Sequence, residues 1–164
     1  LGGAIAIPMI AALLVQLIVS RTSTRTGDKV WHVAGAMFIG AIGLGLSPFA
    51  TDMSTALFLV CLSAIGIYAA MGVWWTIPTT FLTGPAAAGS VALINSCGNL
   101  GGWVGPYMMG WVKTTTGDFH LGYFIMAACM FVAGITVLSI QYAWNGKKKP
   151  AEDELTEKDL LVEE

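Results

Sequence analysis

The sequence predicts an all-α membrane protein with five transmembrane helices. Of its 164 residues, 55% are hydrophobic and only 11% are charged, and the mean hydropathy is +0.72. Soluble domains carry roughly a quarter charged residues, so a water-soluble globule of this composition would lack a polar shell. The charges gather between long apolar stretches, at residues 21–29, Asp52, residues 113–118 and from Lys147 onward. A lipid bilayer is therefore the expected environment.

Five apolar stretches are long enough to cross a bilayer, which takes roughly 20 residues of helix. They lie at residues 3–20, 33–50, 55–82, 87–112 and 121–144. Their length and the lack of strict alternation favour helices over strands. A helix also satisfies its own backbone hydrogen bonds, which lipid cannot do.

Basic residues gather in loops that would share one side of the membrane. The loop after the first stretch holds Arg21, Arg25 and Lys29, and three lysines follow the fifth stretch. The loops on the opposite side hold a single basic residue, Lys113. Because short cytoplasmic loops carry the excess of Lys and Arg, we expect a multi-pass protein of the cell's inner (plasma) membrane with a cytoplasmic C-terminus.

The chain divides into residues 1–146, which hold the helices, and residues 147–164, an acidic tail. We expect the tail to be solvated, and flexible or loosely helical. The first residue is Leu1, and no basic region of a signal peptide precedes the first apolar stretch. A piece of a longer protein is the expectation.

Enzymatic and cofactor chemistry find no support in the sequence. There is no nucleotide-binding loop and no metal-ligand spacing of His, Cys and carboxylates, so we expect no enzyme, no cofactor, no metal and no nucleic-acid partner. The cysteines are interpreted as packing residues. No charged residue lies within an apolar stretch except near its ends. If the protein is proton-coupled, its titrating groups lie in another part.

The first polar constellation is VWWTIPTTFLTG, residues 73–84. Its four threonines recur at helical spacing and share one face: Thr76, Thr79, Thr80 and Thr83. Pro78 lacks an N–H, so we expect the carbonyl of Trp74 to lose its helical partner and to meet a ligand together with the hydroxyls. The alternative is that the hydroxyls bond back to the preceding turn and proline only bends the helix.

The second constellation lies in residues 90–111, where Asn95 and Asn99 share a helix face among overlapping GxxxG pairs. A carboxamide can bind a carboxylate or hydroxyl of a substrate without adding charge. Alternatively, a carboxamide joins neighbouring helices. We favour this interpretation for Asn99, because it lies beside the glycines. Trp74 or Trp75 is a candidate to stack on a planar or sugar-like substrate. The candidate substrate-binding residues are Trp74, Thr76, Thr79, Asn95 and Asn99.

These residues carry a resemblance to a known family. WTIPTTFLTG (75–84) and AAAGSVALINSCGNLGGWVGPYMMGWVKTTTG (86–117) resemble the C-terminal half of the major facilitator superfamily, and more narrowly its anion:cation symporter family. RTSTRTGDKVWHVAG (21–35) resembles the family's cytoplasmic loop between helices eight and nine. The family's usual Ser-Asp-Arg is here Ser23-Thr24-Arg25, so the ion pair that the acidic residue supports is not implied.

The resemblance implies helices eight to twelve of a twelve-helix transporter, a partial C-terminal six-helix bundle. It implies symport of small organic anions, such as sugar acids, dicarboxylates or aromatic acids, with a proton or cation. The charged part of the site would lie in a missing N-terminal half, and Trp74, Thr76 and Asn95 would occupy cavity positions. The alternatives are transport of a neutral or cationic solute, or a non-transporting membrane subunit.

Overall fold

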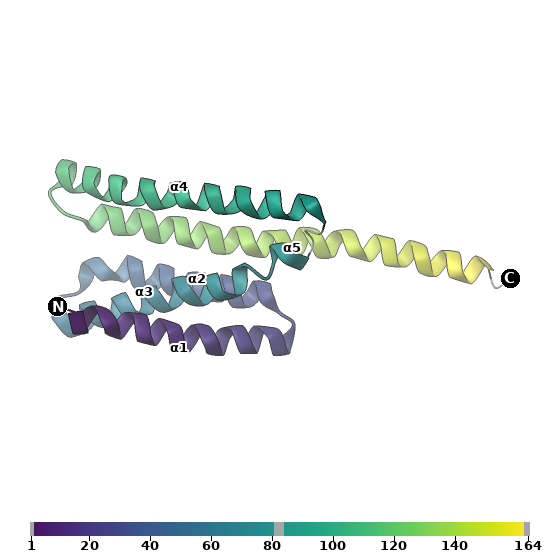
Figure 1. Cartoon of the computed structure of the whole chain (residues 1–164), viewed down its shortest axis with the longest axis horizontal. Coiled ribbons are helices and arrows are strands. Elements are labelled where there is room, and N and C mark those ends of the chain that lie inside the picture. The colour runs from purple at the N-terminus through teal and green to yellow at the C-terminus, as the bar shows by residue number, and fades with distance from the viewer. Residues whose placement is uncertain (1, 81–83, 163–164) are drawn as a thin grey trace.

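The protein is all-helical over the residues that the structure, a computed structural model, describes. These are residues 2–80 and 84–162, with side chains at 6–79, 84 and 87–142. Figure 1 shows the arrangement of its helices, which are listed here with the two short 3₁₀ turns: α1 (Gly2–Thr26), α2 (Lys29–Leu46), η1 (Ser47–Phe49), α3 (Met53–Trp74), η2 (Pro78–Thr80), α4 (Pro85–Thr116) and α5 (His120–Val162). The predicted all-α class is confirmed.

Four segments are long and apolar enough to cross a membrane. They are Ala6–Thr26, Lys29–Phe49, Met53–Trp74 and His120–Tyr142. The fourth predicted span, 87–112, lies within α4, but α4 is not among these four segments. Between Asn95 and Gly110 it carries five glycines and two asparagines, which lower its hydropathy. The described residues form five α-helices, whereas a membrane crossing by α4 and the six-helix bundle both stay predictions.

The helix boundaries follow from local chemistry. Asp28 caps α2 by accepting the N–H of Trp31 at 3.1 Å, and Asp52 caps α3 by accepting the N–H of Thr55 at 2.8 Å. Gly27 adopts a φ of +72° in the tight turn before α2, where a side chain would be strained. The third helix ends earlier than the predicted 82, at Trp74, while α5 runs from His120 on to Val162.

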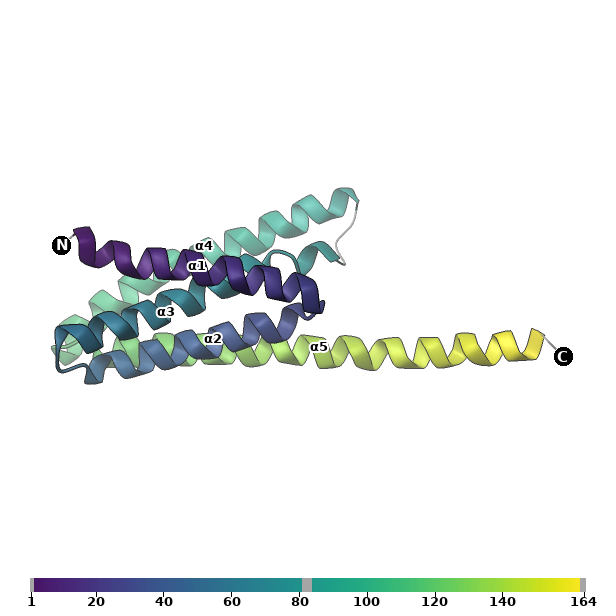
Figure 2. The same ribbon diagram turned by 90° about the horizontal axis from the view of Figure 1, so that it is seen from below.

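Successive helices run in opposite directions, so their connections gather at two ends of the molecule (Figures 1 and 2). The α1–α2 turn and residues 75–80, which we call the α3 exit, lie at one end. We call this the basic end, because it carries Arg21, Arg25 and Lys29. The α2–α3 and α4–α5 turns lie at the other end. This alternation agrees with the predicted succession of loops.

The core lies where α2 meets α3 and α5. A Cβ added at Gly43 would lie 2.7 Å from the Ser63 hydroxyl and 2.8 Å from its backbone nitrogen. Small residues therefore let α2 and α3 approach closely, as in packed membrane helices. On the other side of α2, the rings of Phe38 and Phe131 pack with centroids 5.0 Å apart. This core holds α3 and α5 on either side of α2.

Candidate functional site

The α3 exit is an irregular segment whose backbone is internally bonded. The N–H of Thr76 donates to the Val73 carbonyl at 3.0 Å, and the N–H of Ile77 donates to the Trp74 carbonyl at 2.9 Å. Pro78 removes one helical donor, but a tighter turn supplies another. The expectation that the Trp74 carbonyl is left without a partner is therefore wrong.

The predicted threonine hydroxyls also bond locally. Thr76 Oγ1 donates to the Val73 carbonyl at 2.7 Å, and Thr79 Oγ1 donates to the Thr76 carbonyl at 3.1 Å. Both side chains are exposed and keep oxygen lone pairs that can accept. The side chain of Thr80 and all of Thr83 lie outside the described residues. The local bonds favour the structural interpretation of this stripe.

A lysine that the sequence interpretation placed only as a loop charge contacts the α3 exit. Lys29 Nζ donates to the carbonyl of Thr76 at 3.1 Å. Carbonyls at the C-terminal end of a helix carry partial negative charge, which an ammonium group stabilises. Lys29 thus ties the start of α2 to the end of α3.

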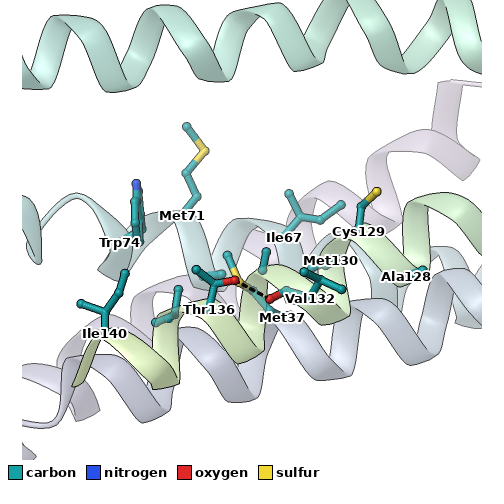
Figure 3. A pocket seen from close by; sticks show the side chains of 13 residues that line it. Met37, Ile67, Met71, Trp74, Ala128, Cys129, Met130, Val132, Thr136 and Ile140 are labelled. Atoms are coloured by element: carbon teal, nitrogen blue, oxygen red, sulfur yellow. Dashed lines mark hydrogen bonds between the residues drawn. The ribbon is translucent and has the colours of Figure 1, made fainter. Parts of the chain in front are cut away.

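Trp74 lines an open groove of about 840 Å³ between α3 and α5. Figure 3 shows Trp74 and Met71 pointing from α3 toward the side on which α4 passes. The lining is almost wholly apolar, and the one hydroxyl in it, on Thr136, donates to the Val132 carbonyl at 2.9 Å. The other lining residues are Met37, Ile67, Ala70, Ala128, Cys129, Met130, Val132, Ala133, Val137 and Ile140. This surface can take an apolar or aromatic group rather than a charge.

The two asparagines lie on α4, away from this groove. Asn95 and Asn99 are exposed, and neither is among the residues that line the groove. One and two turns further along α4, the rings of Trp103 and Tyr107 stack with centroids 5.7 Å apart and planes 9° apart. Because each step is four residues, the amides and rings form one polar-to-aromatic stripe, which we call the α4 stripe.

The glycines of α4 make no close contact within the described part of the chain. A Cβ added at any of them between Gly98 and Gly110 would have nothing within 4 Å. Their predicted role in close helix packing is thus not realised against α1, α2, α3 or α5 as described. The predicted site residues fall into two separate groups: Thr76 and Thr79 in the α3 exit with Trp74 directly before it at the end of α3, and Asn95 with Asn99 on α4.

The sequence interpretation missed the groove residues on α5 and the contact of Lys29. Thr136 is one of the few hydroxyl-bearing residues in the apolar stretch 121–144, which is a weak signal, and its neighbours across the groove are more than fifty residues away in the sequence. His32 lies in the first turn of α2, where its Nδ1 pairs with the Asp28 carbonyl. The buried Ser23 hydroxyl donates to the same carbonyl at 3.3 Å.

Comparison with known proteins comes from curated relatives, since no family model and no solved structure matches the chain. A protein of Agrobacterium vitis named a tartrate transporter is 44% identical over 133 residues, 81% of this chain and 31% of the relative. The quinolone resistance transporter of Acinetobacter baumannii is 35% identical over 84% of this chain and 31% of its own. The inner membrane transport protein RhmT of Escherichia coli is 29% identical over 83% of this chain and 32% of its own.

The matched relatives belong to one class of protein. All are transporters of the major facilitator type, and the chain spans about a third of the length of each of the three. With its apolar helices, the chain is part of a multi-pass membrane protein. The chain is therefore a homologue of one stretch of the membrane transporters of the major facilitator type.

Proposed function

We propose that the chain is part of a secondary active transporter that moves a small organic anion together with a proton or another cation. Sugar acids, dicarboxylates and aromatic acids are the substrate classes. The observation that supports this most directly is the 44% identity to a protein named a tartrate transporter, because tartrate is a small dicarboxylate. The chain spans only about a third of that relative, so further helices complete the transporter.

Asn95, Asn99 and Trp74 are the residues that we assign first to the substrate. The exposed carboxamides offer N–H donors to a carboxylate without adding charge. Trp74 offers an aromatic face at the groove. Thr76 and Thr79 donate to backbone carbonyls, so they take part by accepting from a substrate hydroxyl.

The charge that balances the anion comes from outside these helices in this proposal. No Asp, Glu, Lys or Arg occurs at residues 30–51, 53–112 or 119–146. Ion-pairing and proton-relaying groups of transporters are charged side chains within the membrane. The N-terminal part of the complete transporter therefore supplies the anion-binding cation and the coupling group. The basic end faces the cytoplasm of the inner membrane.

Uptake by the complete protein in proteoliposomes tests the proposal. With an inward proton or sodium gradient, we expect accumulation of a dicarboxylate or sugar acid, and collapse of the gradient should abolish it. A panel of matched neutral and cationic solutes serves as the control. If no organic anion accumulates under either gradient while the reconstituted protein is folded, the proposal fails.

A solute of different charge is the second candidate, and one relative favours it. The quinolone resistance transporter of Acinetobacter baumannii, 35% identical over 137 residues, is named for resistance to a drug class rather than for uptake of a nutrient. Accumulation of a neutral or cationic solute from the same panel, without the organic anions, would support this candidate.

A further inference from the structure

The last turn of α3 is in close contact with two polar side chains of α1. Gln16 and Ser20 are the polar residues of α1 between residues 6 and 20, and both lie against Gly72. A Cβ added at Gly72 would lie 2.8 Å from Cγ of Gln16, 2.9 Å from its Nε2 and 3.0 Å from Oγ of Ser20. The Gln16 side chain therefore occupies the space that a side chain at position 72 would need.

Apolar packing on either side fixes the register of this contact. Val15 and Val19 of α1 pack against the core cluster that includes Val73, which is only 2% exposed. Because these valines are the chain neighbours of Gln16 and Ser20, α1 cannot slide along α3 without opening the core. The contact joins residues of this chain alone, so it does not depend on the helices that complete the transporter.

Gly72 precedes the candidate substrate-binding residue Trp74 by two positions in the same helix. Two helical residues correspond to a rotation of about 200°, so these residues lie on nearly opposite sides of α3. Trp74 lines the groove between α3 and α5, while Gln16 contacts the other side of α3 at Gly72. A shift of the α3 backbone at Gly72 is therefore carried to the indole ring.

We propose that Gln16 is a positioning residue for Trp74, because its side chain on Gly72 sets the distance between α1 and the end of α3. The inference rests on the proposed function and deepens it, since it assigns a preference among the proposed organic anions. Aromatic acids, which can stack on the indole, depend on Gln16. Aliphatic dicarboxylates, which have no ring to stack, do not.

Fluorine NMR of the complete protein labelled with 5-fluorotryptophan tests the positioning without any substrate. The resonance of Trp74 is identified by its loss in Trp74→Phe. Gln16→Ala empties the space at Gly72, Gly72→Ala overfills it, and each should shift this resonance. The double variant Gln16→Ala/Gly72→Ala exchanges one side chain for the other, so it should return the resonance toward that of the unchanged protein, as coupled sites do.

Two control variants separate this contact from general disturbance. Gln16→Met is unbranched and similar in length, and should leave the Trp74 resonance in place because the contact is steric. It decides the question together with Gln16→Ala if Gly72→Ala does not fold. Gly35→Ala, where nothing lies within 4 Å of the new methyl group, should also leave the resonance in place. A resonance that neither Gln16→Ala nor Gly72→Ala moves, or that the double variant moves further than either, would overturn the proposal.

Uptake by the same variants tests the preference among substrates. For Gln16→Ala we expect the KM for an aromatic acid to rise about 2- to 12-fold with kcat unchanged, and the KM for an aliphatic dicarboxylate to change by less than about twofold. Gln16→Met should keep both values. Equal changes for the two acids would overturn the assigned preference. If the complete protein accumulates no organic anion, the proposed function fails, whereas the Trp74 resonance still decides the positioning.

Discussion

Lys29 Nζ donates to the backbone carbonyl of Thr76 at 3.1 Å, joining residues 47 positions apart in the sequence. The same carbonyl accepts from Thr79 Oγ1, so two donors converge on one oxygen at the α3 exit. Two residues earlier lies Trp74, which lines the groove between α3 and α5. The contact therefore holds the segment that places a candidate substrate-binding side chain.

Replacing Lys29 should loosen the α3 exit. For Lys29→Met we expect faster amide exchange at residues 76 and 77 and a loss of stability of about 1 kcal/mol, because an ammonium no longer stabilises the end carbonyl. Hydrogen exchange with mass spectrometry measures the first effect and thermal unfolding the second. Lys113→Met, at the other end, is the control. Unchanged exchange at the α3 exit would contradict the prediction.

The close approach of α2 and α3 should make Gly43 intolerant of any side chain. For Gly43→Ala we expect a net loss of about 1–3 kcal/mol, because the new methyl group would meet Ser63, including its backbone nitrogen at 2.8 Å. The matched control is Gly35→Ala in the same helix, where nothing lies within 4 Å and alanine favours the helix by about 1 kcal/mol. Equal stability of the two variants in thermal unfolding would refute the packing described.

The helices and their order could be predicted from the sequence because lipid cannot satisfy backbone hydrogen bonds, which restricts the structures that an apolar segment can adopt. Long apolar runs must form helices, and aspartates in caps and glycines in turns mark their ends. Asp28 and Asp52 act in this way. The end of α3 was misjudged, because an apolar run continues to 82 while Pro78 and local hydroxyl bonds favour a tight turn that hydropathy does not register.

The candidate site was harder to predict because it depends on contacts between distant segments. The groove joins Trp74 of α3 to Ile140 of α5, and nothing in either run indicates the other. The threonines at 76 and 79 carried the right spacing for a polar face, but spacing does not reveal which acceptors lie nearest. A backbone carbonyl one turn back is always available to a helical threonine, and it was used here.

The cap at Asp52 should make the α2–α3 turn sensitive to acid. Hydrogen bonds from the Thr55 side chain and then its backbone N–H lower the pKa of this carboxyl from its ordinary 3.8. A lowered folded-state pKa means that the carboxylate stabilises the fold above the ordinary value, and that this stabilisation is lost as pH falls through the lowered pKa.

Asp52→Asn separates this titration from capping, since asparagine also caps helices well. We expect the variant to lose the acid-dependent part of stability at this turn while α3 still begins at Met53. Thermal unfolding of the variant and of the unchanged protein between pH 2 and 5 measures this difference in the pH dependence of stability. Its size should follow the pKa shift that is typical of a hydrogen-bonded carboxylate. Identical pH dependence in the two proteins would show that Asp52 does not contribute.

The α4 stripe and the α3 exit should differ in their effect on transport. In the complete protein, Asn95→Ala should raise the KM for the organic anion roughly 10- to 100-fold, because a hydrogen bond to a charged group is worth about 1.5–3 kcal/mol. Ser96→Ala, one position away and also exposed, is the matched control and should leave KM unchanged. Thr76→Val should change KM by less than about threefold, because its hydroxyl proton is already donated to Val73. A larger effect at Thr76 than at Asn95 would move the substrate from α4 to the α3 exit, and that outcome would favour a ligand whose hydroxyls donate over one whose carboxylate accepts.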